Sequence, residues 1–143
     1  MSETKNFGKS IRARLLNVAK QEEVFYQTIL TRYFQERLLY RISQTRYREN
    51  FYLKGGALMY AYERFAARPT LDIDFLGTRI SNDGKRIAEA FREICSVNYK
   101  EDGVQYDCDK IATQNITEFK DYHGVRLSIP VAMDTIAQVL TMD

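Results

Sequence analysis

Two aspartates interrupt the apolar stretch TLDIDFLG, residues 70–77, and this stretch constrains the fold more than any other part of the chain. Side chains alternate between the two faces of a strand, so Ile73 and Phe75 can be buried while Asp72 and Asp74 share the other face, ~7 Å apart. A buried carboxylate without a partner is very costly. The pattern therefore predicts a strand that covers a core with one face and presents two acids to water or to a cation.

The rest of the chain is typical of one globular domain. It has 143 residues, 45% of them hydrophobic, which is enough to build a core. No apolar run approaches the ~18 residues of a membrane helix, and the polar start lacks the apolar segment of a signal peptide. Two cysteines, Cys95 and Cys108, and one histidine argue against a disulfide framework and a zinc site. We therefore expect a cytoplasmic protein with no membrane partner.

Charge is distributed unevenly, although the net charge is only +2. Residues 1–50 contain ten Lys/Arg and five Asp/Glu, a balance of +5, whereas residues 51–143 contain eleven and fourteen, a balance of −3. A basic half beside an acidic half suits a polyanion binder next to a metal site. Solvated helix faces would give the same counts, and the sequence leaves both interpretations open.

The first fifty residues predict two amphipathic helices. One spans residues 10–20, with Ser10 as its N-cap. In the other, within residues 22–43, apolar residues recur at helical spacing and predict a face towards a core. These residues are Tyr26, Ile29, Leu30, Tyr33, Phe34 and Leu38. The opposite face carries four charged residues, Arg32, Glu36, Arg37 and Arg41.

Strands and helices alternate in the middle of the chain, and strands dominate after residue 104. We expect a strand at 51–53, a helix at 57–65, the strand at 70–77 and a helix at 82–95, which Asn82 or Asp83 would cap. Strands with alternating apolar residues follow at 124–131 and 138–143. This order predicts an α+β fold with a mixed or antiparallel sheet and N-terminal helices packed against it. We expect one domain over residues 1–143, with a helical lead-in at 1–48 and an α/β core at 49–143 that is incomplete at its C-terminus.

The two acids of the 70–77 strand suit a divalent metal. Like charges on one face repel unless a cation lies between them, and Mg²⁺ prefers carboxylate oxygens, water and substrate phosphates. Asp143, on the last predicted strand, is the candidate third acid for phosphoryl or nucleotidyl transfer. A chance Asp-x-Asp pair remains the alternative. A calcium loop of the EF-hand type does not fit, because the residues between the acids are apolar.

A glycine pair, Gly55-Gly56, lies between a predicted strand and a predicted helix. Glycine lets the backbone approach a ligand closely, and the N–H groups at a helix start can bind a phosphate. Lys54 and Arg68 could add cationic contacts, and Thr70 lies just before the acids. The sequence leaves a structural alternative open for each of these roles. The glycine pair could form only a tight turn, Lys54 could be an ordinary surface lysine, and Arg68 could form an ion pair with Asp72 or Asp74.

These residues together carry a family resemblance. The stretch YLKGGALMYAYERFAARPTLDIDFLG, residues 52–77, resembles the nucleotidyltransferase-like toxins of the AbiEii/AbiGii family, in the DNA polymerase β-like superfamily. That family combines Leu-Lys-Gly-Gly, a helix and Arg-x-Ser/Thr-x-Asp-Ile-Asp-Phe. Residues 10–43 are similar to its helical lead-in, and residues 122–143 to the stretch that leads to its third acid. The resemblance covers nearly all of this chain but only the N-terminal half of a typical member.

The resemblance implies a metal-dependent transfer of a nucleotide from an NTP to an acceptor, which we expect to be an RNA such as tRNA. It also implies a toxin–antitoxin or phage-defence (abortive infection) system and a cognate antitoxin as partner. By the same resemblance three acids would bind Mg²⁺ or Mn²⁺, and the last of them would help to activate the attacking hydroxyl: Asp72, Asp74 and Asp143. The residues that would bind the NTP are Lys54, Gly55, Gly56, Arg68 and Thr70.

Two departures from the family pattern leave the activity open. The chain has Gly-Gly where the superfamily often has Gly-Ser, which removes a hydroxyl contact to phosphate, and the helical part that normally follows Asp143 is absent. The alternative is therefore a catalytically inactive fragment or a binding module for antitoxin or nucleic acid. A phosphohydrolase that uses the same acids is a third hypothesis.

Overall fold

The structure is a computed structural model that describes residues 6–54, 74–77, 79, 83–119 and 122–143. Its helices are α1 (Phe7–Glu22), α2 (Tyr26–Ser43) and α4 (Gly84–Cys95), with short 3₁₀ turns η1 (Arg46–Glu49), η3 (Lys100–Asp102) and η4 (Cys108–Lys110). Its strands are β1 (Phe51–Lys54), β2 (Asp74–Gly77), β3 (Gln105–Tyr106), β4 (Ala112–Phe119), β5 (Tyr122–Met133) and β6 (Ile136–Met142). The α+β class is confirmed, whereas the predicted helix at 57–65 lies outside the described residues.

Strand β5 is the centre of the larger sheet. It pairs with β4 and β3 along one edge and with β6 along the other. The register sets Leu127 opposite Met142 and Pro130 opposite Val139. Every pairing between described strands is antiparallel, which is one of the two arrangements that the sequence left open.

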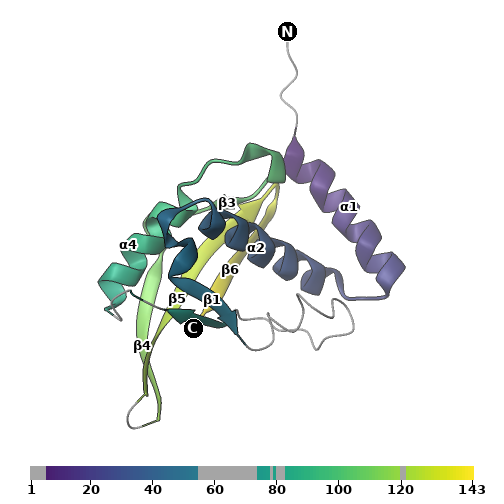
Figure 1. Ribbon diagram of the computed structural model, residues 1–143. Coiled ribbons are helices and arrows are strands. Elements are labelled where there is room, and N and C mark those ends of the chain that lie inside the picture. Colours follow the sequence, from purple (N-terminus) through teal and green to yellow (C-terminus); the bar gives the residue numbers. More distant parts are fainter. Residues whose placement is uncertain (1–5, 55–73, 78, 80–82, 120–121) are drawn as a thin grey trace.

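Helices α2 and α4 cover one face of this sheet (Figure 1). Alternate residues of β5 and β6 point towards the helices and are buried: Leu127, Ile129, Val131, Met133, Leu140 and Met142. They pack against buried residues of the two helices, including Phe34, Leu38, Phe91 and Ile94. Each such side chain contributes about 1.5–3 kcal/mol when fully buried. The alternation predicted after residue 104 is therefore what joins the sheet to the helices.

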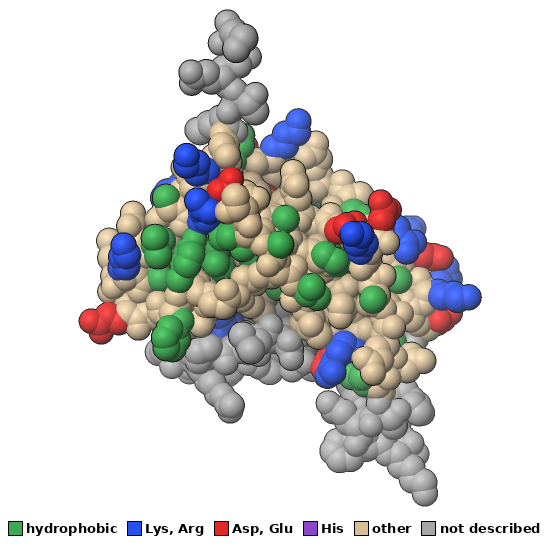
Figure 2. All heavy atoms as spheres, turned by 180° about the vertical axis from the view of Figure 1, so that it is seen from behind, with side chains coloured by type: hydrophobic (Ala, Val, Ile, Leu, Met, Phe, Trp, Pro, Cys, Tyr) green, Lys and Arg blue, Asp and Glu red, His purple; other side chains and the backbone are tan. Residues whose placement is uncertain are grey.

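The other face of the sheet is not covered by α2. Figure 2 shows the molecule from that side, with hydrophobic side chains scattered among polar ones and most Lys and Arg side chains near the edge. Val139, which alternates with the buried Leu140, is 61% exposed. We call this side the open face of the sheet.

The start of α1 differs from the prediction. Asn6, not Ser10, is the N-cap, and its side chain accepts a hydrogen bond of 3.0 Å from the Lys9 N–H. Ser10 lies within the first turn, because Phe7–Lys9 continue the helix towards the N-terminus. At the start of α4, by contrast, one of the two predicted caps is confirmed: Asp83 is the N-cap, and its side chain accepts from the Lys85 N–H.

Candidate active site

Three strand ends meet where β6 finishes. In the β1–β2 ladder Lys54 lies opposite Asp74, so the end of β1 is beside the start of β2. The next residue of β2, Phe75, donates its backbone N–H to the carbonyl oxygen of Asp143 at 3.0 Å. The backbones of Lys54, Asp74 and Asp143, three residues predicted to belong to one site, are therefore neighbours.

Aromatic packing fixes β2 in this position. The Phe75 ring lies 5.9 Å from the Phe51 ring and 6.2 Å from the Phe91 ring, measured between centroids. Phe51 and Phe91 themselves are 5.0 Å apart, so β1, β2 and α4 share one cluster. Leu76, the neighbour of Phe75, is 54% exposed. The predicted alternation is thus confirmed at Phe75, which packs on the core.

The carboxylate of Asp143 pairs with the guanidinium of Arg126. Arg126 Nε donates to Asp143 Oδ1 at 2.8 Å, and Nη2 donates to Oδ2 at 3.2 Å. Leu127 and Met142 are opposed in the sheet and buried, so the next opposed positions, 126 and 143, lie on the open face. The side chains of Arg126 and Asp143 are 43% and 21% exposed.

A second arginine–carboxylate cluster lies within the core, on the helix side of the sheet. Arg41 Nη1 and Nη2 donate to the two oxygens of Asp102 at 2.7 and 3.2 Å, and Arg37 Nε donates to Asp102 at 2.8 Å. The backbone N–H of Val104 donates to the same carboxylate. The sequence assigned Arg41 to the charged face of its helix, but the structure buries it at 2% exposure because Asp102 supplies a counter-charge. Arg32 on that face is also buried.

A family model described as nucleotidyl transferase AbiEii toxin, type IV TA system, matches residues 37–143. The match covers about three quarters of the chain, from the middle of α2 to Asp143. This chain belongs to the AbiEii family. None of the curated proteins matches it.

The AbiEii match includes every residue that the sequence assigned to the site, but the structure describes only some of them. Lys54 and Asp74 are described by their backbone pairing, and Asp143 by its backbone and side chain. Five further predicted residues lie outside the described residues: Gly55, Gly56, Arg68, Thr70 and Asp72. Their roles in metal and NTP binding stay predictions.

Arg126 is the residue that sequence reasoning missed. It stands in the alternating stretch GVRLSIPV, on the face opposite Leu127, which was a visible sign that it points away from the core. Its partner was not visible, because the register between β5 and β6 decides which residue faces it. Among the described residues, no group of three or more His, Cys, Asp or Glu is close enough to hold a metal ion.

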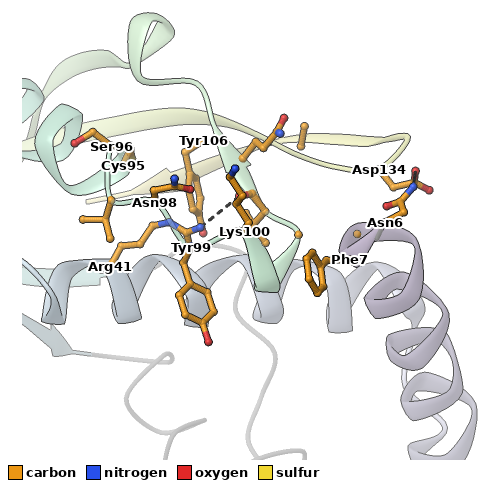
Figure 3. A pocket seen from close by; sticks show the side chains of 16 residues that line it. Asn6, Phe7, Arg41, Cys95, Ser96, Asn98, Tyr99, Lys100, Tyr106 and Asp134 are labelled. Atoms are coloured by element: carbon orange, nitrogen blue, oxygen red, sulfur yellow. Dashed lines mark hydrogen bonds between the residues drawn. The ribbon is translucent and has the colours of Figure 1, made fainter. Parts of the chain in front are cut away.

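A large cavity that described residues line lies elsewhere in this AbiEii chain. It measures about 1030 Å³ and lies between the start of α1, the end of α4 and residues 96–106 (Figure 3). Arg41 reaches its wall, where Nη2 donates to the Val104 carbonyl at 3.3 Å. Asp134, in the β5–β6 turn, also lines it, whereas Asp143 at the other end of β6 does not. The seven residues of β6 span about 20 Å at ~3.3 Å per residue, so this cavity is separate from the candidate site.

Burial keeps two groups at this cavity, Cys95 and Tyr106, in their neutral forms. Burial raises the pKa of the Cys95 thiol to about 12, so it stays protonated at neutral pH. Burial also raises the pKa of the Tyr106 hydroxyl, which donates to the Phe34 carbonyl at 2.6 Å. These groups stabilise the fold. None of the described helices is long and apolar enough to cross a membrane.

Proposed function

We propose that this AbiEii-family chain transfers a nucleotide from an NTP to an RNA acceptor such as tRNA, as the toxin of a toxin–antitoxin pair. The observation that carries the proposal is the backbone hydrogen bond between Phe75 and Asp143. It joins β2, which begins at Asp74, to the residue that follows β6, Asp143, although the two segments are far apart in the sequence. The family's type IV toxin–antitoxin class supports the cognate antitoxin as partner.

The residues present suit a divalent cation. Carboxylates are the protein ligands that Mg²⁺ and Mn²⁺ take at phosphoryl-transfer sites. Asp143 presents such a group on the open face, partly exposed and beside the start of β2. Asp72 and Asp74 would supply the other two carboxylates of the site. A bound cation would supply charge neutralisation for the phosphates of the NTP and for the transferred group.

The chain's own residues would bind and orient the two substrates. Gly55 and Gly56 would bring backbone N–H groups close to the triphosphate, and Lys54, Arg68 and Thr70 would add cationic and hydroxyl contacts to it. Asp143 would accept the proton of the attacking RNA hydroxyl, since a carboxylate within hydrogen-bond distance can act as a general base.

The test is NTP binding in the presence of Mg²⁺, followed by transfer of label to RNA. Wild type, Asp74→Asn and Asp143→Asn are titrated with each NTP, and then incubated with labelled NTP and total tRNA. We expect the two variants to lose binding by at least tenfold and to leave the RNA unlabelled. Asp109→Asn, an exposed aspartate of η4, is the matched control and should behave as wild type.

Undiminished NTP binding in both site variants would overturn the metal role of the acids. Binding of tRNA or antitoxin by the wild type without any transfer of label would instead favour a binding module. Label released as inorganic phosphate without transfer would favour a phosphohydrolase.

A further inference from the structure

One guanidinium engages both carboxylate oxygens of Asp143 in this structure. The distances of 2.8 and 3.2 Å from Arg126 Nε and Nη2 describe a two-point, charge-assisted contact. Arg126 and Asp143 are each the next residue beyond the opposed pair Leu127 and Met142, so the register of β5 with β6 brings them side by side. The pair therefore forms when the sheet folds, before any substrate is bound.

This pairing conflicts with the role of Asp143 as a metal ligand. A divalent cation on the same carboxylate would lie within a few ångströms of the Arg126 charge, and two cations so close repel each other. The guanidinium also covers the two oxygens from one edge of the carboxylate. While Arg126 keeps both contacts, its positive charge offsets the negative charge that Asp143 could otherwise offer to a bound cation.

We propose that Arg126 is the resting counter-ion of Asp143, and that it exchanges the carboxylate for the triphosphate of the incoming nucleotide when the cation binds. This inference rests on the proposed nucleotidyl transfer. The guanidinium is well suited to the exchange, because its planar set of donors fits phosphate as well as it fits carboxylate. Its 43% exposure means that a phosphate on the open face can reach it without disturbing the core.

The exchange has a measurable consequence for each ligand. Without nucleotide, Arg126 opposes cation binding, so the cation alone binds weakly. With nucleotide, Arg126 contributes an attractive contact, so the cation and the nucleotide assist each other. Arg126 thus acts as a positioning residue for Asp143 in the resting protein and as a phosphate contact in the complex.

The first measurement is calorimetric titration with Mn²⁺ alone. We expect Arg126→Gln to bind Mn²⁺ about tenfold more tightly than wild type, because a positive charge beside the site is removed. Arg126→Lys keeps the charge and should remain within about threefold of wild type. Arg86→Gln, an exposed arginine on α4 that changes the net charge equally, is the control and should leave Mn²⁺ binding unchanged. Weaker or unchanged Mn²⁺ binding in Arg126→Gln would overturn the counter-ion role.

The second measurement is binding of non-hydrolysable analogues of the four NTPs, one at a time, at saturating Mn²⁺. For the analogue that wild type binds best, Arg126→Gln should bind at least tenfold more weakly, as expected for a lost arginine–phosphate contact. Unchanged analogue binding would overturn the exchange. Thermal unfolding of each variant without ligand confirms that it is folded.

A double variant separates this inference from the proposed function. In the Asp143→Asn background, Arg126→Gln should raise Mn²⁺ affinity by less than it does in wild type, because the carboxylate that Arg126 occupies is gone. If Asp143→Asn alone binds Mn²⁺ and NTP as wild type does, the proposed function fails. If Asp143→Asn loses binding but Arg126→Gln gains none, the site stands and only the counter-ion role of Arg126 is refuted.

Discussion

Two arginine–aspartate pairs in this AbiEii-family chain have nearly the same hydrogen-bond distances and very different surroundings. The contacts are 2.7 and 3.2 Å in Arg41–Asp102 and 2.8 and 3.2 Å in Arg126–Asp143. Both side chains of the first pair are 2% exposed, whereas those of the second are 43% and 21% exposed. The first pair lies among the helices and the second on the open face of the sheet.

The surroundings decide what each pair can do. Removing one partner of a buried pair leaves an uncompensated charge out of water, which typically costs about 3–5 kcal/mol. A solvent-exposed pair is worth about 0–1 kcal/mol, because water and salt replace the partner. The buried pair is therefore suited to holding α2 against residues 102–104, and the exposed pair can be opened by a competing ion at little cost. The predictions below test this contrast, from the largest expected effect to the smallest.

Asp102→Ala should have the largest effect. The substitution leaves Arg37 and Arg41 without their shared carboxylate, so the free energy of unfolding should fall by about 3–5 kcal/mol. Urea denaturation followed by circular dichroism measures the loss. Asp109→Ala, at an exposed aspartate, should change stability by less than about 0.5 kcal/mol. If Asp102→Ala also lowered the free energy of unfolding by less than about 0.5 kcal/mol, the buried pair would contribute no more than a surface pair.

Acid should weaken the same cluster. Burial tends to raise the pKa of Asp102, but hydrogen bonds from Arg41, the Val104 N–H and Arg37 outweigh it, so the pKa lies below its ordinary value of 3.8. The stabilisation is then complete above the unfolded-state pKa and is lost as pH falls through the folded-state pKa. In denaturation curves from pH 6 to pH 2, the advantage of wild type over Asp102→Asn should shrink below about pH 4. A constant difference across that range would contradict the lowered pKa.

Tyr106→Phe should have a moderate effect. The buried hydroxyl donates to the Phe34 carbonyl at 2.6 Å, and its removal leaves that carbonyl without this donor inside the core. We expect a loss of about 1–2 kcal/mol in the free energy of unfolding, measured by urea denaturation. Tyr52→Phe, at a half-exposed tyrosine of β1, is the control and should be neutral. An equal loss in both variants would show that the effect does not come from burial.

Asp143→Asn should have the smallest effect on the free protein. Because its ion pair is partly exposed, we expect a change of less than about 1 kcal/mol in unfolding free energy without ligand. Wild type should gain thermal stability when Mg²⁺ and the NTP that it binds are added, as expected for ligands that bind only the folded state. The variant should lose this gain. A large loss of stability in the ligand-free variant would instead assign Asp143 to the fold.

The sequence by itself determined the local structure and the family. The structure confirms three local predictions: the packing of Phe75 on the core, the burial of Phe34 and Leu38 on one helix face, and a cap at Asp83, one of the two candidates. Each depends only on residues a few positions apart in the sequence. The motif at residues 52–77 predicted the AbiEii family in the same way, as a short ordered pattern.

Tertiary structure alone decided which distant residues meet. Helical spacing assigned Arg41 to a charged face, and only the approach of Asp102 explains its burial. Alternation turned Arg126 and Asp143 away from the core, but the register of β5 with β6 made them partners, and β2 reached Asp143 through one backbone hydrogen bond. A local pattern sets the face on which a side chain lies. The partner on that face depends on strand register and helix packing, which are properties of the whole folded chain.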